Sequence, residues 1–239
     1  MITTTIFFDL YQTLVYFHPE REYRQAMALK QFGFDVDPAE LRRGYLAADH
    51  YYTLAAMETP IHLLDRDGRE QVYLRYQQVM MEEVGLDHAT HLAKQIRNRY
   101  WEMDRELRPF LDAEQTLAKL KQAGYRLGLI TNVADDPIQD LERVGLRKWF
   151  DTMTASCLVG VEKPDPRIFQ AAMSEMGITP EQGVHVGDQF LADVQGAQSV
   201  GLKALLLDRY DLQEGRHPVR IRSLNELPPL LANGVDMGR

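Results

Sequence analysis

An aspartate that directly follows an apolar run near the start of the chain is the strongest candidate for chemistry. Residues Ile6 to Phe8 are apolar without polar alternation, a pattern that favours a buried parallel strand. Asp9 would then lie at the carboxyl edge of a sheet, where open α/β sheets bind their ligands. A carboxylate there either caps the next segment or attacks phosphorus or carbon to form a covalent intermediate. Thr13 follows four residues later, and a threonine so close usually bonds the local backbone.

Two later segments supply groups that phosphoryl transfer to a carboxylate requires. Thr131 and Asn132 end a second apolar run, where a hydroxyl and local N–H groups could hold a phosphoryl oxygen. Asn132 could equally cap the helix that follows. Lys163 precedes Pro164 in a loop, where a lysine is normally solvated. In this set of residues it would neutralise both Asp9 and an approaching phosphate.

A fourth segment carries two acidic residues after a predicted strand that ends at Gly187. These residues are Asp188 and Asp193, and two acids at this spacing in a loop are often simply solvated. If they converge on Asp9, the concentrated negative charge requires a cation. Carboxylate oxygens and a substrate phosphate favour Mg²⁺. The sequence therefore predicts a magnesium site at the same edge of the sheet.

The four segments, in this order and at this spacing, resemble the motifs of the haloacid dehalogenase-like (HAD) hydrolase superfamily. The similarity is to the branch that carries a helical cap between the first and second motifs, and it covers nearly the whole chain. It implies a nucleophile at Asp9 and further catalytic groups at Thr131 and Lys163. It also implies a substrate site formed by Thr13, Thr131, Asn132 and Lys163.

The resemblance further implies how the metal would be held. Its ligands would be Asp9, the backbone carbonyl of Tyr11, and Asp188, with Asp193 either ligating the metal or orienting a water. The cofactor that the resemblance implies is Mg²⁺, and the partner is a small phosphorylated substrate.

Tyr11 departs from the pattern of the phosphatases in this superfamily. Most of them carry a second aspartate at this position, which protonates the leaving group and then activates water. General acid–base help is typically worth ~10²–10⁴ in rate, and a tyrosine with a pKa near ~10 is a poor base at neutral pH. A tyrosine here, followed by Thr13, is similar instead to the 2-haloacid dehalogenases, which attack carbon without a metal. Those enzymes lack the acidic pair, and without a metal Asp188 beside Asp9 would be an unfavourable like-charge pair.

Our hypothesis is a Mg²⁺-dependent phosphate-monoester hydrolase. Its acid/base function is weak or comes from another residue, for instance His18 or His50. The alternative is hydrolysis of a 2-haloacid, with Arg42 or Arg43 as the anchor for the substrate carboxylate. A third hypothesis is a catalytically silent binding protein that keeps the fold.

The pattern of predicted elements gives the fold class, an α/β, doubly wound parallel sheet with a four-helix bundle, and the resemblance implies that this bundle is the cap. The α/β core comprises residues 1–15 and 109–239, and the helical cap residues 16–108. Within the cap, helices are expected from Tyr23 to Gly33, from Asp37 through Ala48, over 67–84 and over 88–107. The core alternates as follows: strands at 2–9, 126–131, 152–155, 183–187 and 203–207, and helices at 111–123, 136–144, 166–176, 191–199 and 223–231.

Composition narrows the class of protein. The chain has 239 residues, 45% hydrophobic and 26% charged, with a net charge of −8, which opposes non-specific binding of nucleic acid. The single cysteine, Cys157, excludes an internal disulfide. No signal peptide pattern is present, and no apolar run approaches the ~20 residues that a membrane helix needs. We expect a cytoplasmic monomer or homodimer without nucleic-acid or membrane partners.

Overall fold

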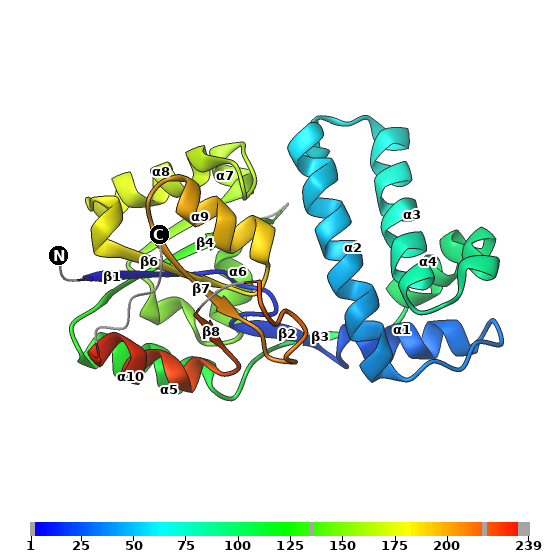
Figure 1. Cartoon of the computed structure of the whole chain (residues 1–239), viewed down its shortest axis with the longest axis horizontal. Coiled ribbons are helices and arrows are strands. Elements are labelled where there is room, and N and C mark those ends of the chain that lie inside the picture. The colour runs from blue at the N-terminus through cyan, green and yellow to red at the C-terminus, as the bar shows by residue number, and fades with distance from the viewer. Residues whose placement is uncertain (1–2, 134–135, 217–218, 234–239) are drawn as a thin grey trace. The chain divides into compact units, whose positions relative to one another are not determined.

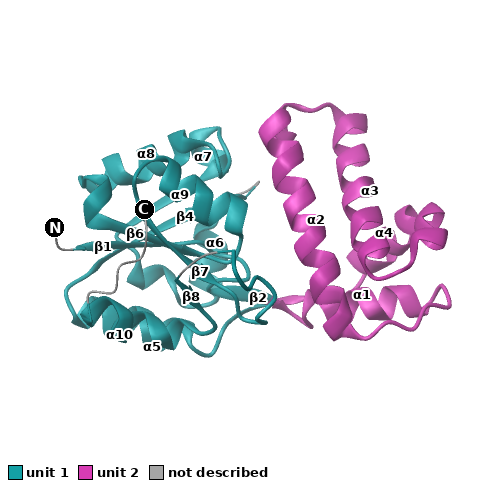
Figure 2. Cartoon of the chain, in the orientation of Figure 1, with its two compact units in different colours: residues 1–16, 107–239 teal, residues 17–106 magenta. Residues whose placement is uncertain are grey.

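The computed structural model describes residues 3–133, 136–216 and 219–233. The chain forms two compact units, which Figure 2 colours separately. The α/β unit comprises residues 1–16 and 107–239, and the helical unit comprises residues 17–106. No helix among the described residues is both long enough and apolar enough to cross a membrane.

A six-stranded parallel sheet forms the centre of the α/β unit. Its strands are apolar and mostly buried, as expected for a sheet that is covered on both faces. Figure 1 shows α7, α8 and α9 on one face and α5 and α10 on the other, which confirms the predicted doubly wound α/β fold. The strand order is β5 (Thr152–Ala155), β4 (Arg126–Thr131), β1 (Thr5–Phe8), β6 (Gly183–Gly187), β7 (Lys203–Leu207) and β8 (Arg220–Ile221).

The central strand β1 pairs with β4 on one side and with β6 on the other. After β1 the chain adds strands first on the β4 side and later on the β6 side, so the strand order changes direction at β1. A strand order of this kind creates a crevice at the carboxyl ends of the strands, and ligands of open α/β folds bind there. Residues Thr5–Phe8 are completely buried, which explains why the predicted strand over 2–9 was recognisable. The first residue of that prediction lies outside the described residues.

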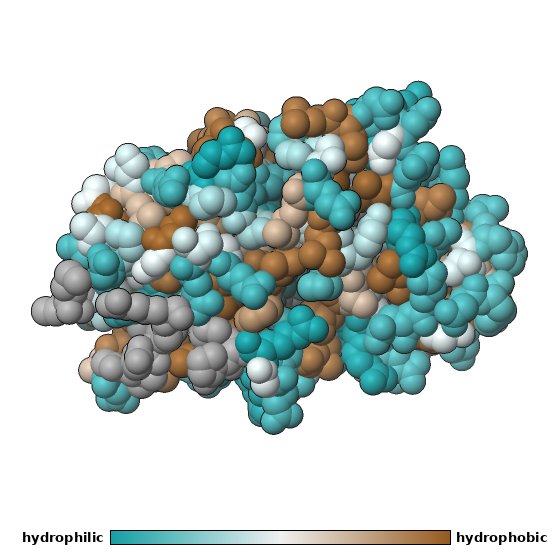
Figure 3. All heavy atoms as spheres, turned by 45° about the horizontal axis from the view of Figure 1, so that its top comes forward, coloured by the Kyte–Doolittle hydropathy of each residue, from teal (hydrophilic) through white to brown (hydrophobic). Residues whose placement is uncertain are grey.

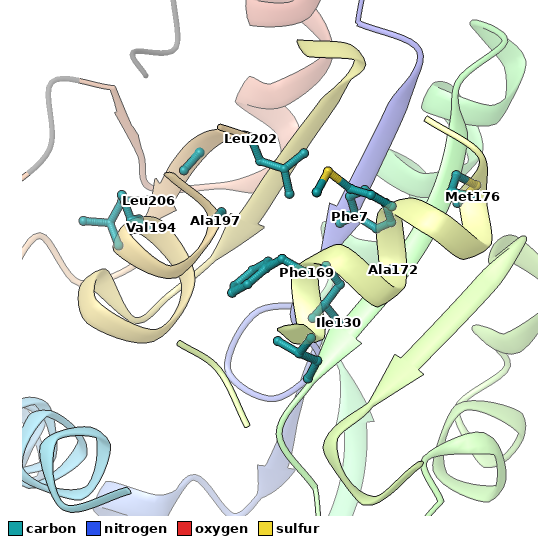
Figure 4. Packing of buried hydrophobic residues seen from close by; sticks show 12 residues of the cluster. Phe7, Ile130, Phe169, Ala172, Met176, Val194, Ala197, Leu202 and Leu206 are labelled. Atoms are coloured by element: carbon teal, nitrogen blue, oxygen red, sulfur yellow. The ribbon is translucent and has the colours of Figure 1, made fainter. Parts of the chain in front are cut away.

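Helix α8 (Pro166–Met176) fixes one face of the sheet. It begins at the N-cap Asp165, whose side chain accepts a hydrogen bond from the Arg167 amide, and it ends at the left-handed Gly177. Its Phe169 packs with Phe7, Ile130 and Leu202 in one buried cluster (Figure 4). The packing around Phe7 is tight enough that a Cβ on Gly128 would lie 2.5 Å from its ring.

The helical unit contains four α-helices around a second apolar cluster. A cap at Asp37 followed by Pro38 starts the longest of them, as predicted. Gly44 allows α2 and α3 to pack closely, because a Cβ there would lie 2.8 Å from the Met80 carbonyl oxygen. The helices are α1 (Arg21–Lys30), α2 (Pro38–Glu58), α3 (Arg66–Glu83) and α4 (Ala93–Trp101), with short helical turns η1 (Ile61–Leu63) and η2 (Asp87–Leu92).

The two connections between the units are strands, which the sequence did not predict. Strands β2 (Val15–His18) and β3 (Glu106–Pro109) pair as a two-stranded sheet. The predicted helix over 88–107 is therefore wrong at its end, since α4 stops at Trp101. Pairing between segments about ninety residues apart leaves no local signal, and strand propensity depends strongly on context.

The remaining elements complete the α/β unit. The predicted α-helix over 191–199 is wrong in its first half, because residues Phe190–Gln195 form a π-helical turn, η5. Such turns insert one extra residue and occur frequently at functional sites. The other elements are α5 (Ala113–Gln122), α6 (Ile138–Arg143), η3 (Arg147–Trp149), α7 (Ser156–Val159), η4 (Pro180–Gln182), α9 (Gly196–Ser199), η6 (Leu224–Glu226) and α10 (Leu227–Ala232).

Large apolar side chains on the surface are scattered. Figure 3 shows separate apolar patches in a largely polar face. Leu54, Met57 and Leu63 of the helical unit are among the exposed ones, as is Leu111 of the α/β unit. Scattered apolar residues are normal on proteins and define no binding surface by themselves.

Candidate active site

The carboxyl ends of β1, β4 and β6 bring the predicted site residues together. Asp9 directly follows β1, and its backbone N–H donates to the Val186 carbonyl at 2.9 Å. Thr131 is the last residue of β4, and Gly187 is the last residue of β6. The parallel pairing of these three strands therefore places residues from three distant parts of the sequence at one edge.

Lys163 joins two carboxylates at the centre of this edge. Its Nζ donates to Asp9 Oδ1 at 2.7 Å and to Asp193 Oδ1 at 2.6 Å. The lysine is only 3% exposed. Burial alone would lower the pKa of Lys163, but Asp193 and Asp9 outweigh it and hold that pKa well above its ordinary value. The ammonium is therefore charged at neutral pH and compensates both acids.

Asn132 holds the backbone of Lys163. Its side-chain amide donates to the Lys163 carbonyl at 2.9 Å, and its Oδ1 accepts from the Lys163 N–H at 2.7 Å. The sequence predicted either a phosphate contact or a helix cap for Asn132. It did not predict these hydrogen bonds between the loop of Asn132 and the loop of Lys163. Because both ends of the amide are used, Asn132 fixes the loop that carries the lysine.

The carboxylate of Asp193 accepts hydrogen bonds from three donors. Its Oδ1 contacts His185 Nε2 at 2.9 Å besides Lys163, and its Oδ2 accepts from the Gln189 N–H at 3.0 Å. Burial alone would raise the pKa of Asp193, but Lys163 and His185 lower it well below its ordinary value. Gly187 is required beside it, because a Cβ there would lie 2.2 Å from Asp193 Cγ.

His185 was not among the residues singled out from the sequence. It lies in β6 between two valines and is completely buried. Burial lowers the pKa of His185, so the ring is neutral at pH 7, and the contact with Asp193 Oδ1 is a hydrogen bond from Nε2–H. Its signal in the sequence was a single polar residue in the middle of an apolar strand.

Asp9, Asp188 and Asp193 form an acidic cluster. Each offers one carboxylate oxygen, and the three oxygens lie within 4.8 Å of one another. Burial and the charge of Asp193 raise the pKa of Asp9 despite the neighbouring Lys163. Three carboxylate oxygens at this separation suit a hard divalent cation such as Mg²⁺. The cluster therefore fits the metal that the sequence predicted.

Two threonine hydroxyls near this edge have no hydrogen-bond partner among the described residues. They are Oγ1 of Thr13, which is completely buried, and Oγ1 of Thr131, which is 1% exposed. Buried hydroxyls are normally paired, so each of these two is available to donate to a ligand or water. Both lie in the segments where the sequence predicted contacts to a phosphate.

The side chain of Tyr11 contacts α6. Its hydroxyl donates to Asp140 Oδ2 at 2.7 Å. Burial and the hydrogen bond to Asp140 raise the pKa of Tyr11 well above its ordinary value, so the phenol stays protonated at neutral pH. A tyrosine in this state cannot act as a base. The next residue, Gln12, adopts a left-handed backbone with φ of 63°, which turns the chain sharply after Tyr11.

The remaining predicted residues belong to the helical unit. His18 ends β2, while Arg42, Arg43 and His50 are on α2 of the helical unit. Arg43 and His50 are exposed. Their parts in acid–base chemistry or in substrate anchoring remain predictions.

The family is established by comparison with known proteins. The model of the haloacid dehalogenase-like hydrolase family matches residues 3–201, and this chain therefore belongs to that family. The match spans all of the segments that meet at the carboxyl edge of the sheet.

Curated relatives include enzymes of two kinds. The chain is 43% identical over 103 residues to the glyceraldehyde 3-phosphate phosphatase of Methanothermobacter thermautotrophicus, a match that covers 43% of this chain and 46% of that protein. It is 32% identical over 149 residues to the (S)-2-haloacid dehalogenase 4A of Burkholderia cepacia, covering 59% of this chain and 63% of that protein. The matched segments thus span about half to two thirds of these relatives.

Among solved structures, the chain is similar to a 2-haloacid dehalogenase from Pseudomonas syringae pv. Tomato DC3000. The TM-score is 0.59 at 25% identity, and the match covers 98% of this chain and all of the other. The similarity therefore extends over both units of the chain.

Proposed function

We propose that this protein is a Mg²⁺-dependent phosphate-monoester hydrolase that forms an aspartyl-phosphate on Asp9. The observation that carries the proposal is the buried ion pair between Lys163 and Asp9 beside two further carboxylates. An attacking carboxylate meets an anionic phosphate only where cations offset both charges. The similarity to a glyceraldehyde 3-phosphate phosphatase supports this chemistry.

In the first step, a carboxylate oxygen of Asp9 attacks phosphorus and the ester oxygen of the leaving group departs. Lys163 offsets the charge on Asp9 and on the approaching phosphate from a fixed position. The unpaired hydroxyls of Thr13 and Thr131 supply donors for the phosphoryl oxygens. In the second step, water opens the aspartyl-phosphate at phosphorus and regenerates the carboxylate.

The metal would be held by Asp9, Asp188 and the backbone carbonyl of Tyr11. When bound, Mg²⁺ supplies the positive charge that lets the phosphate approach the acidic cluster. Asp193 already accepts hydrogen bonds from Lys163, His185 and the Gln189 N–H. We therefore assign Asp193 to orienting Lys163 and metal-bound water instead of direct ligation.

Substrate choice is assigned to the helical unit, in the role of the cap domain that the sequence predicted. The substrate that we propose is a small phosphorylated molecule, because the cation at the centre of the site is the single ammonium of Lys163 between Asp9 and Asp193. Since Tyr11 replaces the acid/base aspartate, leaving groups that depart without a proton are preferred.

The second candidate function is hydrolysis of a 2-haloacid. Tyr11 favours it, and so does the similarity to a haloacid dehalogenase. The acidic cluster opposes it, because Lys163 supplies one positive charge beside three close carboxylates and, without a metal, the remaining negative charge is not offset.

A panel of phosphate esters and 2-haloacids, each assayed with Mg²⁺ and with chelator, tests the proposal. We expect phosphate release that requires Mg²⁺ and disappears in Asp9→Asn, with no halide release. Halide release that persists in chelator would establish the dehalogenase instead. Absence of turnover on both substrate classes, in a protein that binds them, would support a silent binding protein.

A further inference from the structure

A loop outside the four segments identified in the sequence contacts the loop that carries Asp188. Gln213, in the connection between β7 and β8, donates from Nε2 to the backbone carbonyl of Asp188 at 2.9 Å. Gln213 is only 5% exposed. The contact therefore fixes, from the side of β7, the backbone of a residue that belongs to the acidic cluster.

Gln213 is itself held in place by a buried carboxylate. Asp208, which directly follows β7, accepts from the Leu212 N–H at 3.0 Å and from the Gln213 N–H at 2.8 Å. Arg220 at the start of β8 donates to the same carboxylate at 2.6 Å. Asp208 is 4% exposed. The side chain of Gln213 thus projects from a backbone that two hydrogen bonds and an ion pair fix.

The other end of the Gln213 amide has no partner. Because a carbonyl oxygen only accepts hydrogen bonds, the NH₂ group must face Asp188, and the orientation of the amide is settled. Gln213 Oε1 is then buried without a donor among the described residues. Buried polar atoms of this kind are usually satisfied by an ordered water or by a ligand.

We propose that Gln213 is a positioning residue for the cation site. Its Nε2 fixes the loop that carries Asp188, and its Oε1 accepts a hydrogen bond from a water carried by the metal. Mg²⁺ usually keeps several of its waters, and these are donors of the kind that Oε1 lacks. This inference rests on the proposed Mg²⁺ site and adds to it a residue that contacts neither the metal nor the substrate.

The test is calorimetric titration of Mg²⁺ into the full-length protein and its variants, without substrate. Gln213→Met keeps the length of the side chain but removes both hydrogen-bonding atoms. Partners outside the ligand shell typically contribute 10–100-fold to metal affinity, so we expect the Kd for Mg²⁺ to rise by about that factor. Gln213→Asn, whose amide is one methylene too short, should show the same loss and decides the question if the methionine variant does not fold.

Gln115→Met is the matched control, because that exposed glutamine also donates to a remote acceptor, Asn225 Oδ1, in the α/β unit. Its Kd for Mg²⁺ should equal that of the wild type. Melting temperatures in chelator distinguish a role in the cation site from a purely structural role. A purely structural role would lower the melting temperature of Gln213→Met and leave its Kd for Mg²⁺ unchanged. That result, or wild-type affinity in either folded Gln213 variant, would overturn the inference. If the wild type itself binds no Mg²⁺, the proposed metal site fails instead.

Discussion

The hydroxyl of Tyr11 donates a hydrogen bond to Asp140 Oδ2 at 2.7 Å, and this contact uses the only proton that the side chain can donate. The residue that replaces the acid/base aspartate of related phosphatases is thereby directed at a carboxylate of α6. Burial and Asp140 keep the phenol protonated by raising its pKa. In the proposed mechanism Asp9 is the nucleophile and Lys163 offsets the charge, but Tyr11 supplies no base.

The first prediction concerns leaving groups. General acid help is typically worth ~10²–10⁴ in rate, so aryl and acyl phosphates should exceed alkyl phosphates in kcat/KM by about 10²-fold or more. Tyr11→Phe should leave this ratio unchanged, because the hydroxyl proton is donated to Asp140 and not to the leaving group. A series of phosphate esters with graded leaving-group pKa measures the effect. Equal rates for alkyl and aryl esters would mean that another residue, such as His18 or His50, acts as the acid.

The second prediction concerns the ammonium at the centre of the site. Lys163→Met leaves Asp9 and Asp193 buried without their shared cation, and breaking a buried pair in this way typically costs about 3–5 kcal/mol of unfolding free energy. Turnover should fall by about 10²–10³ or more, the usual effect of removing one charge-stabilising donor.

Lys148→Met is the control for this loss. Its ion pair with Glu114 is more than half exposed on both sides, so the change should cost only about 0–1 kcal/mol. Denaturant unfolding of both variants measures the difference. Similar losses in the two would contradict the idea that Lys163 is held by buried charge.

The third prediction concerns His185. A glutamine can place its Nε2–H where the imidazole Nε2–H donates to Asp193, but a leucine cannot. His185→Leu should therefore lose about 1–3 kcal/mol of stability relative to His185→Gln, the cost of leaving a buried carboxylate short of a donor. Unfolding in the presence of chelator isolates this effect from metal binding. A leucine variant as stable as the glutamine variant would show that Asp193 does not depend on the histidine.

The fourth prediction concerns acid stability. Asp112 accepts hydrogen bonds from Arg209, Ser223 and the Leu224 N–H. Burial alone would raise the pKa of Asp112, but Arg209 and Ser223 outweigh it, and the folded-state pKa lies below the ordinary value. A depressed carboxyl pKa stabilises the fold fully above the unfolded value of about 3.9, so this contribution is complete at neutral pH and is lost as the pH falls through the folded pKa.

Asp112→Asn should consequently be less stable than the wild type at pH 7, with a difference that shrinks as the pH falls below about 4. Unfolding free energies of both proteins at several pH values between 3 and 7 provide the comparison. Two parallel curves would contradict this account of Asp112.

Much of the fold could be predicted from local patterns. The strands that became β1, β4, β6 and β7 are apolar runs bounded by polar residues, and burial on both faces of a sheet produces that pattern directly. The strands β2, β3 and β8 have four residues or fewer and were missed. Unlike the equally short β1, they are not buried along their whole length, so the continuous apolar run that marks a buried strand does not extend through them.

The residues of the candidate site also fall into those that the sequence predicted and those that it did not. Asp9 was identifiable because it directly follows a buried apolar run, whereas Lys163 and Asp193 were identifiable only because the four segments together resemble the HAD motifs. His185 and Gln213 were missed, because their importance comes from what the fold places beside them. The π-helical turn that carries Asp193 was also missed, since its residues have the apolar periodicity of an ordinary helix.

The most direct test of the central claim is to trap the covalent intermediate. The protein is mixed with an aryl phosphate in the presence of Mg²⁺, quenched in acid within one turnover, and digested for mass spectrometry. The account predicts phosphate on the peptide that contains Asp9, absent when chelator replaces Mg²⁺ and absent in Asp9→Asn. Turnover of the ester with no phosphate on that peptide, or with equal labelling in chelator, would contradict it.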